Sequence, residues 1–473
     1  MHSSIFPFIS LCISTCAIKA SELSHPRTLH LQRKASFNTT QLPSYSTQLT
    51  SWHTGYELTF QTEVTFGNQT LSVLVDTGSS DIWVLGPNWV CINDTSNATL
   101  PQEACTYGSQ TYTPSTTFHE ISDMYFGELL GAGRVSGLFG LEDVTLGGIT
   151  VTSQHIGVVN TSSNFGDGVY TGIVGFGYPS MTSSHNGSIV NADNTTYSVN
   201  ASTYNPLFNS MAQEGLVEEA YFSIALERTP FNATTGPGGY LTLGGLPPVS
   251  YNPKFATVPV EIAPLPTEIT GGIANSRSWW AINISGIIFS PASNPHNTTT
   301  NSTTALAVVD TGNWFNYVDP ETASGINDLF EPPGQWNMET SPITYTIDCN
   351  ARAPNLGFTI GGQTFFHNGM DLVYRVGDGT CVSAVVSNEG VQLYGLTGVI
   401  LGDTFLKNVV AVFDFGNNEM RFAERTEGRS NTSSISPPSP VSLMSAASSV
   451  TWHLLSLIVI ATTSSVFFLV SFI

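Results

Sequence analysis

The sequence predicts an all-β fold, made mainly of strands and arranged as two related lobes. Residues that favour strands are plentiful, with 27 Phe and 16 Tyr, and 43 Gly and 26 Pro punctuate short apolar runs. No long stretch shows the 3.6-residue period of an amphipathic helix. Two separated sequence elements recur in the same order in both halves of the chain, which indicates an internal duplication. The 473 residues are enough for two lobes that each have a core.

The composition excludes two broad classes of protein. Hydrophobic residues make up 41% of the chain and charged residues only 10%, which excludes a disordered protein. The formal net charge of −21 argues against nucleic acid as a partner, because phosphate binding needs a basic surface. The acidity fits work at low pH, where carboxylates lose their charge, but simple solubility explains it equally well.

The N-terminal region has the features of segments that are removed during secretion. Residues 1–20 are read as a signal peptide, because an apolar run ends near small residues. Residues 21–45 are read as a short propeptide that carries Arg27, Arg33 and Lys34, and Arg33-Lys34 is a candidate processing site. The alternative for this second segment is an ordinary flexible N-terminus.

Glycosylation acceptors and cysteines also point to the secretory pathway. The chain has thirteen N-x-S/T sequons, which matter only if it is secreted, although an Asn-, Ser- and Thr-rich chain also produces them by chance. Two pairs of cysteines lie close in sequence and far from each other. We expect the disulfides Cys91–Cys105 and Cys349–Cys381, typical of an oxidising compartment. No cysteine or histidine spacing indicates a metal site.

The duplicated elements carry the candidate chemistry. Residues 74–79 read Leu-Val-Asp-Thr-Gly-Ser, and residues 308–313 read Val-Val-Asp-Thr-Gly-Asn. An apolar-apolar-Gly run follows each, at 173–175 and at 400–402. We therefore expect an N-terminal lobe at 52–250 that contains Asp76 and a C-terminal lobe at 251–425 that contains Asp310.

Each repeat places a carboxylate where a buried strand ends and glycine permits a tight turn. Two such turns related by pseudo-symmetry would bring Asp76 and Asp310 face to face, and two carboxylates in contact share one proton. Thr77 and Thr311 would hydrogen-bond across the pair and hold it rigid. The residues expected to support the pair are Thr77, Gly78, Ser79, Thr311, Gly312 and Asn313.

With these motifs, residues 52–425 resemble the pepsin family of aspartic proteases. Residues 76–84 are similar to the family's first active-site motif, and residues 171–177 and 399–406 resemble its two psi-loop segments. Residues 412–418 and 421–423 resemble its closing strands, and both expected disulfides resemble family bridges. The tail and the loop between Cys91 and Cys105 are similar to the fungal yapsin-type branch.

The resemblance implies an aspartic endopeptidase with its active site in the cleft between the lobes. It would hydrolyse peptide bonds of extended polypeptides at acidic pH, with water activated by the Asp76–Asp310 dyad, no cofactor and a monomeric enzyme. It also implies a flap over the cleft, with Tyr125 as the candidate flap tyrosine, hydrogen-bonded to Trp83.

Two departures from the family pattern motivate a rival hypothesis. Asn313 stands where the family has a hydroxyl residue, and the stretch around Tyr125 differs from the usual Tyr-Gly-x-Gly hairpin. The alternative is therefore a cell-surface binding protein that keeps the fold and has lost catalysis. Both aspartates remain in intact Asp-Thr-Gly contexts, which argues against it.

The C-terminal region has the layout of a lipid-anchor signal. Residues 428–449 form a Ser/Pro-rich stalk, and residues 450–473 are largely apolar, carry no charge and end the chain. This order is typical of a GPI signal, which predicts attachment to the membrane or cell wall. Candidate attachment residues are Asn431, Ser442 and Ser445, and the alternatives are a spanning helix or an uncleaved tail.

Overall fold

The computed structural model describes residues 45–53, 58–131, 133–163, 166–187, 200–230, 233–267, 270–337, 344–376, 379–389 and 398–426, all within one compact unit. The expected signal peptide, stalk and apolar tail lie outside these residues, as does the expected propeptide except for Tyr45. Among the described residues, no helix is both long and apolar enough to span a bilayer.

The N-terminal half is almost entirely β-structure. Its strands are β1 (Ser46–His53), β2 (Leu58–Phe66), β3 (Gln69–Asp76), β4 (Ile82–Cys91), β5 (His119–Leu130), β6 (Gly133–Leu146), β7 (Ile149–Ser163), β8 (Gly172–Gly175), β9 (Ser184–Asn186), β10 (Ala201–Ser202), β11 (Tyr221–Leu226) and β12 (Thr235–Leu243). Its short helices are η1 (Gln102–Ala104), η2 (Pro179–Met181) and α1 (Leu207–Gln213).

The C-terminal half repeats this character with shorter strands. They are β13 (Ala256–Pro259), β14 (Ala281–Ile284), β15 (Gly286–Ser290), β16 (Thr299–Asn301), β17 (Ala305–Val309), β18 (Asn316–Val318), β19 (Gln335–Asn337), β20 (Thr344–Ile347), β21 (Asn355–Ile360), β22 (Gln363–Phe366), β23 (Val373–Arg375), β24 (Cys381–Ser383), β25 (Val385–Ser387), β26 (Val399–Leu401), β27 (Val409–Asp414) and β28 (Glu419–Glu424). Its helices are α2 (Pro320–Asn327), η4 (Gly369–Leu372) and α3 (Asp403–Leu406).

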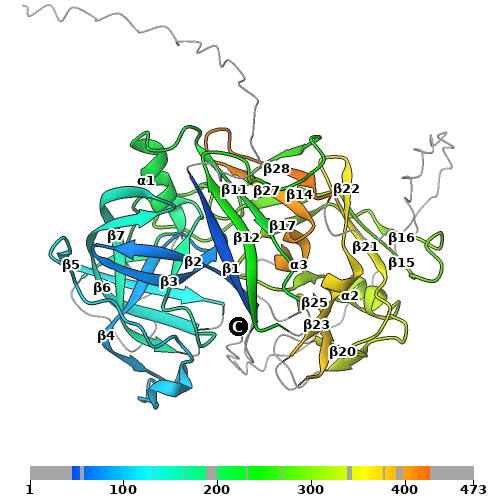
Figure 1. The fold of residues 1–473 in the computed structure, drawn as a ribbon, viewed down its shortest axis with the longest axis horizontal. Coiled ribbons are helices and arrows are strands. Elements are labelled where there is room, and N and C mark those ends of the chain that lie inside the picture. Colours follow the sequence, from blue (N-terminus) through cyan, green and yellow to red (C-terminus); the bar gives the residue numbers. More distant parts are fainter. Residues whose placement is uncertain are drawn as a thin grey trace, which may run out of the picture. The chain divides into compact units, whose positions relative to one another are not determined.

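A central run of strands joins the two halves. The strand order β1-β12-β11-β27-β28-β13 combines strands from both halves of the sequence in one sheet. Figure 1 shows β1 and β12 side by side between the strands of the two lobes. The large buried side chains that pack here include Phe222, Trp280 and Phe413, with the Phe222 and Phe413 rings stacked 4.7 Å apart. This shared core supports both lobes from one side, and the prediction of an all-β, two-lobed fold is confirmed.

The internal duplication appears directly in the strand pairings. In the first lobe β3 runs parallel to β8, and β8 runs antiparallel to β4, which is parallel to β7. In the second lobe β17 runs parallel to β26, and β26 runs antiparallel to β18, which is parallel to β25. The first residues after β3 and β17 therefore start from equivalent places in two copies of one motif.

Candidate active site

The two Asp-Thr-Gly turns meet at the ends of equivalent strands. Asp76 is the last residue of β3, and Asp310 directly follows β17. Both strands end in apolar residues that are paired with a parallel neighbour, so the chain leaves each sheet at a defined point and enters a turn. A side-chain carbon added to Gly78 would lie 2.5 Å from the Asp310 carboxyl, and one added to Gly312 would lie 2.6 Å from Asp76 Oδ1. Glycine is required at both positions because each turn packs directly against the opposite aspartate.

Two threonines lock the turns together with four hydrogen bonds. Thr77 N–H donates to Thr311 Oγ1 over 3.1 Å, and Thr311 N–H donates to Thr77 Oγ1 over 3.0 Å. The hydroxyls donate in turn to the carbonyls of Val309 and Val75, over 3.0 and 2.7 Å. The arrangement is two-fold symmetric and buried, so it fixes the separation of the two aspartates. The cross-pair hydrogen bonds expected from the sequence are present.

Each carboxylate receives one backbone donor and one side-chain donor. Gly78 N–H and Ser79 Oγ donate to the two oxygens of Asp76 over 2.7 and 2.6 Å. The second lobe has the same geometry around Asp310, with Gly312 N–H at 2.8 Å and Asn313 Nδ2 at 2.5 Å. The Asn313 amide therefore takes the donor position that a hydroxyl occupies in the first lobe, and this departure from the family pattern leaves Asp310 with its full set of donors.

Burial and charge make the pair hold a proton. Asp76 and Asp310 are only 6% and 8% exposed. Burial, the charge of Asp76 and a hydrogen bond between the two carboxyls raise the pKa of Asp310 to about 8, against the donors from Asn313 and Gly312. Asp310 thus holds its proton well above the pH at which an ordinary aspartate loses it. A carboxylic acid beside a carboxylate is an acid and a base within reach of one bound molecule.

Comparison with known proteins now decides the family. The model of the eukaryotic aspartyl protease family matches residues 59–425, which includes both aspartates and most of the described structure. This chain belongs to that family. The expected resemblance is therefore confirmed, and the protein is an aspartic-type peptidase.

Its relatives match it over most of their length. A probable aspartic-type endopeptidase of Aspergillus fumigatus is 38% identical over 389 residues, covering 81% of this chain and 82% of the relative. Cathepsin E of Aquarana catesbeiana is 28% identical over 369 residues, covering 75% and 76%. Rhizopuspepsin of Rhizopus chinensis is 25% identical over 375 residues, covering 78% and 79%.

The hairpin of β5 and β6 is the candidate flap of the protease, but its residues differ from expectation. Its turn follows Leu130, which pairs with Gly133. Tyr125 lies five residues earlier, opposite Leu138, and stacks on His185 at 5.2 Å. The expected hydrogen bond between Tyr125 and Trp83 is absent, since the buried indole N–H of Trp83 has no hydrogen-bond partner among the described residues. That expectation was wrong because the tyrosine was aligned too close to the turn.

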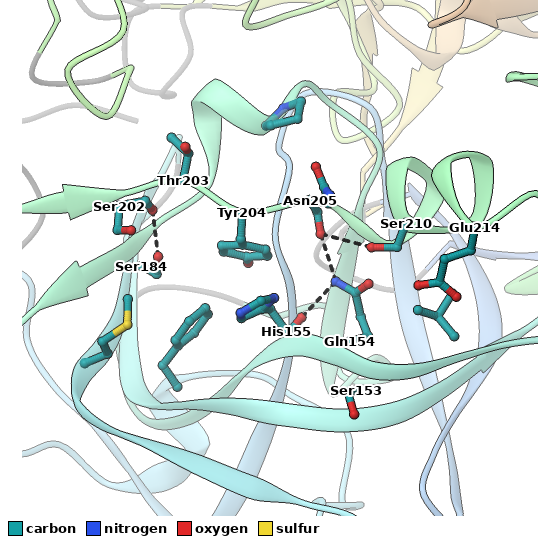
Figure 2. Close-up of a pocket in the computed structure, with 14 residues that line it drawn as sticks. Ser153, Gln154, His155, Ser184, Ser202, Thr203, Tyr204, Asn205, Ser210 and Glu214 are labelled. Atoms are coloured by element: carbon teal, nitrogen blue, oxygen red, sulfur yellow. Dashed lines mark hydrogen bonds between the residues drawn. The ribbon is translucent and has the colours of Figure 1, made fainter. Parts of the chain in front are cut away.

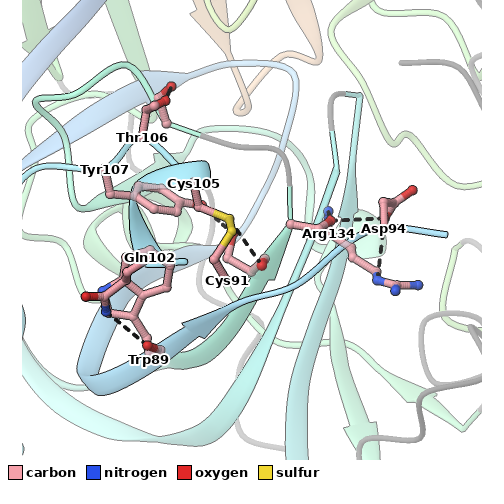
Figure 3. Close-up of a disulfide and its surroundings, with 11 residues drawn as sticks. Trp89, Cys91, Asp94, Gln102, Cys105, Thr106, Tyr107 and Arg134 are labelled. Atoms are coloured by element: carbon pink, nitrogen blue, oxygen red, sulfur yellow. Dashed lines mark hydrogen bonds and ion pairs between the residues drawn. A yellow bond between two sulfur atoms is a disulfide. The ribbon is translucent and has the colours of Figure 1, made fainter. Parts of the chain in front are cut away.

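Both expected disulfides are confirmed. Cys91 bonds to Cys105 and Cys349 bonds to Cys381, with Cα atoms 5.7 and 5.2 Å apart. Figure 3 shows the first bridge beside Trp89, whose carbonyl accepts a hydrogen bond of 3.0 Å from Gln102 Nε2. It closes the loop that follows β4, the strand that carries Trp83.

The same loop is tied to the hairpin by charge. Arg134, one residue into β6, lies 3.5 Å from Asp94 and also donates to Asn97 (Figure 3). The Arg134 side chain is only about 4% exposed, which makes this ion pair more effective than a surface one. Because Arg134 pairs with Leu129 next to the turn, the turn end of the candidate flap is held to a disulfide-closed loop.

A cavity in the first lobe lies apart from the two aspartates. It measures about 510 Å³, and its lining includes His155, Tyr204, Asn205 and Glu214 (Figure 2). Neither Asp76 nor Asp310 lines it. Among the described residues, no group of histidine, cysteine or acidic side chains could hold a metal ion.

Sequence reasoning missed three buried acids around the dyad. Asp81, Glu128 and Asp403 are at most 5% exposed, and burial raises the pKa of each. The burial of Glu128 could have been inferred from the alternation of side chains along β5, because Glu128 shares a face of this strand with the buried Phe126. Asp81 and Asp403 lie inside the matched motifs 76–84 and 399–406, but a sequence alone does not tell a buried acid from an exposed one.

Proposed function

We propose that this protease is an endopeptidase that hydrolyses polypeptides at acidic pH, with a water molecule activated between Asp76 and Asp310. The observation that carries the proposal is the symmetric placement of the two aspartates, each with its own backbone and side-chain donor, together with the raised pKa of Asp310. A carboxylate and a carboxylic acid side by side supply a base and an acid together.

The roles of the two aspartates follow from their surroundings. Asp76 accepts hydrogen bonds from Gly78 and Ser79, and in the proposed mechanism it removes a proton from the attacking water. Asp310 donates its proton toward the oxygen of the scissile carbonyl as the water oxygen bonds to the carbonyl carbon. The tetrahedral diol then collapses: its C–N bond breaks, the proton held by Asp76 passes to the leaving nitrogen, and one diol hydroxyl returns its proton to Asp310. No cofactor takes part in these steps.

Acidic pH follows from the need for one proton on the pair. Catalysis requires Asp310 to be neutral and Asp76 to be ionised, so activity rises as Asp76 loses its proton and falls as Asp310 loses its own. Burial and the charge of Asp76 raise the pKa of Asp310, so Asp310 keeps its proton throughout the acidic range.

The proposal is tested with single isosteric variants. Asp76→Asn and Asp310→Asn should each lower kcat by about 10⁴-fold or more, as removal of an essential acid or base does, while circular dichroism stays unchanged. Asp348→Asn, at an exposed turn position, is the matched control and should retain full activity. Turnover of a peptide substrate by either dyad variant within tenfold of the wild type would refute the dyad.

We also propose that the protease acts at the cell surface as a glycoprotein with a GPI anchor. The support comes from the sequence alone: the sequons, the Ser/Pro-rich residues 428–449 and the uncharged apolar residues 450–473. Removing residues 428–473 should release active enzyme into the medium. If mass spectrometry finds residues 450–473 in the mature membrane-bound protein, a spanning tail replaces the anchor.

A further inference from the structure

Arg134 is an unusual residue for the turn end of a hairpin, because it is a buried cation. It lies one residue into β6, opposite Leu129 of β5. A buried guanidinium is unfavourable unless acceptors lie close to it. The residues that supply these acceptors therefore indicate what the turn end of the candidate flap is built to contact.

Two of these acceptors come from the loop that follows β4. Arg134 Nε lies 3.5 Å from Asp94 Oδ1, as Figure 3 shows. The same guanidinium donates through Nη2 to Asn97 Oδ1. The Asp94 side chain is about 32% exposed, so the buried cation of the hairpin is paired with an acid that solvent can still reach.

The backbone of Arg134 reaches the same acid through Ser163. Its N–H donates to Ser163 Oγ over 3.1 Å, and this hydroxyl donates to Asp94 Oδ1 over 3.0 Å. Ser163 is the last residue of β7 and is fully buried. Asp94 thus holds the side chain of Arg134 directly and its main chain through one hydroxyl. We call Arg134, Asp94, Asn97 and Ser163 the clamp.

The loop presents its acceptors from a short hydrogen-bonded turn. Asn93 N–H donates to the Ala98 carbonyl over 2.8 Å, and Asn97 N–H donates to the Asn93 carbonyl over 2.9 Å. The disulfide Cys91–Cys105 closes the loop at its base. Asp94 and Asn97 are therefore fixed to a support that lies outside the hairpin.

The clamp lies where the backbone pairing of three strands ends. Arg134 pairs with Leu129 on one side and with Ser163 on the other, and in the described strands the pairing of β6 with β7 stops at this residue. The ends of sheets open more easily than their centres. Side-chain contacts at this last position therefore decide whether the turn end stays ordered.

The clamp supplies polar support that Trp83 does not. The last strand residue before the turn is Leu130, whose side chain has no hydrogen-bonding group. The buried indole N–H of Trp83 has no partner within the described part of the chain. The polar attachment of the turn end to Asp94 and Asn97 is thus made on the loop and not on the strand that leads from the dyad.

We propose that Arg134 is a positioning residue for substrate binding: its contacts with Asp94 and Asn97 keep the turn end of the β5–β6 hairpin ordered before a polypeptide enters the cleft. A flap that is already ordered loses less conformational entropy when the substrate binds, which lowers KM. The proposal gives Arg134 no part in proton transfer, so kcat should not depend on it. This role rests on the hairpin being the flap of the peptidase.

The first experiment is amide hydrogen exchange of residues 127–136 at pH 5. All proteins carry Asp76→Asn to prevent self-digestion. Arg134→Gln and Asp94→Ala should each exchange about tenfold faster than the parent in this segment, or more, because the end of the sheet opens more often. Exchange of β27, in the core shared by the lobes, should be unchanged.

A matched control tests whether any ion pair has this effect. Arg352→Gln breaks the pair of Arg352 with Glu331 in the second lobe, whose atoms lie 3.3 Å apart and are more exposed. Exchange of the hairpin should equal that of the parent in this variant. Faster exchange of the hairpin in Arg352→Gln would show a general loosening of the fold and would overturn the proposal.

A double variant tests whether Asp94 acts through Arg134. In that case Arg134→Gln combined with Asp94→Ala should exchange like Arg134→Gln alone. Additive effects would show two independent structural contributions and would overturn the proposal, as would unchanged exchange in Asp94→Ala. Asp94 lies on an accessible loop, so its variant decides the matter even where Arg134→Gln does not fold.

Steady-state kinetics of the active enzymes on a peptide substrate provide the functional readout. Arg134→Gln and Asp94→Ala should raise KM about fivefold or more and leave kcat within about twofold, because a flap that is ordered in about a fifth of the molecules binds about five times more weakly. Arg134→Lys keeps the charge and should raise KM less. A lower kcat with unchanged KM would overturn the positioning role.

Hydrogen exchange and kinetics separate this proposal from the catalytic mechanism. Exchange needs no turnover, so it reports the clamp even in a protein that hydrolyses nothing. Faster exchange in Arg134→Gln and Asp94→Ala, in a wild-type protein without peptidase activity, would contradict the proposed dyad mechanism and support the clamp.

Discussion

Asp81→Asn should raise the free energy of unfolding at neutral pH. Asp81 is fully buried, and burial raises its pKa from the ordinary 3.8 to about 6, against hydrogen bonds from Tyr204 and Ser183. An acid with a raised folded pKa contributes stability below its unfolded pKa and loses it as the pH rises through the folded value. The difference between 3.8 and about 6, at 1.36 kcal/mol per pH unit, corresponds to about 3 kcal/mol lost between pH 4 and pH 7.

The substitution changes little else in the structure. The amide oxygen introduced at position 81 would still accept from Tyr204 and Ser183, as Asp81 Oδ1 does. A loss of about 3 kcal/mol is a large part of the roughly 5–15 kcal/mol that stabilises a typical domain, so the effect is measurable. The variant should match the wild type near pH 4 and exceed its free energy of unfolding by about 3 kcal/mol at pH 7.

The assay is urea unfolding followed by circular dichroism at pH 4, 5, 6 and 7. Both proteins carry Asp76→Asn to prevent self-digestion, and Asp76 is not among the groups that shift the pKa of Asp81. Asp328→Asn, at an exposed helix end, is the control and should run parallel to the wild type. If the curves for Asp81→Asn and wild type also run parallel across this pH range, the raised pKa is wrong.

Three further predictions concern the dyad and the second lobe. Gly312→Ala places a methyl group 2.6 Å from Asp76 Oδ1 and should lower kcat/KM by about 100-fold or more in a folded protein, as circular dichroism would verify. Asn313→Leu removes the donor that lowers the pKa of Asp310, so the upper limb of the pH–rate profile should move to higher pH, whereas Asn313→Thr restores a donor and should move it less. Burial lowers the pKa of His367 to about 4, so its neutral form is favoured in the fold and stability is lost as the pH falls from about 6.5 to 4. His367→Gln should reduce this loss. The shift from 6.5 to about 4 corresponds to at most about 3 kcal/mol, and the expected effect is smaller because His367 is partly exposed, as urea unfolding at pH 4 and 6.5 would show.

The parts of the structure that depend on local pattern could be predicted from the sequence. A strand, an aspartate and a glycine in close succession predict a turn, and two copies predict two related turns. Nearby cysteines have few partners within reach, so their pairing was also predictable. The position of Thr77 beside Thr311 followed from the same symmetry, because each residue repeats the other's place in the motif.

The parts of the structure that depend on strand register and burial could not be predicted from the sequence. Tyr125 and Leu130 both lie in an apolar stretch, and only the pairing of Leu130 with Gly133 places the turn. Glu128 looks like any polar residue near a hairpin end until the pairing shows which face of β5 turns inward. Whether Asn313 donates a hydrogen bond to Asp310 could not be predicted either, because the reach of the Asn313 amide depends on a rotamer that a sequence does not specify.

The buried acids and His367 together set opposite limits on stability. Asp81, Glu128, Asp310 and Asp403 have raised pKa values because of burial, so each holds a proton that the unfolded chain releases at lower pH, and the fold loses stability as the pH rises toward neutral. His367 acts in the other direction, because its ring accepts from Asn316 Nδ2 at 2.9 Å and contacts the Leu356 carbonyl at 3.1 Å, an arrangement that needs the neutral imidazole. Because four acids stabilise the fold at low pH and one histidine stabilises it at higher pH, the net effect favours stability at acidic pH. Between about pH 4 and pH 6 the stability lost at Asp81 and the stability gained at His367 nearly offset each other, so the other three acids decide the direction. The protein is therefore expected to be more stable near pH 4 than near neutral pH. Asp310 keeps its proton in the same acidic range, since its pKa is about 8. The buried carboxyl of Asp310 thus contributes both to stability in acid and to the proposed catalysis.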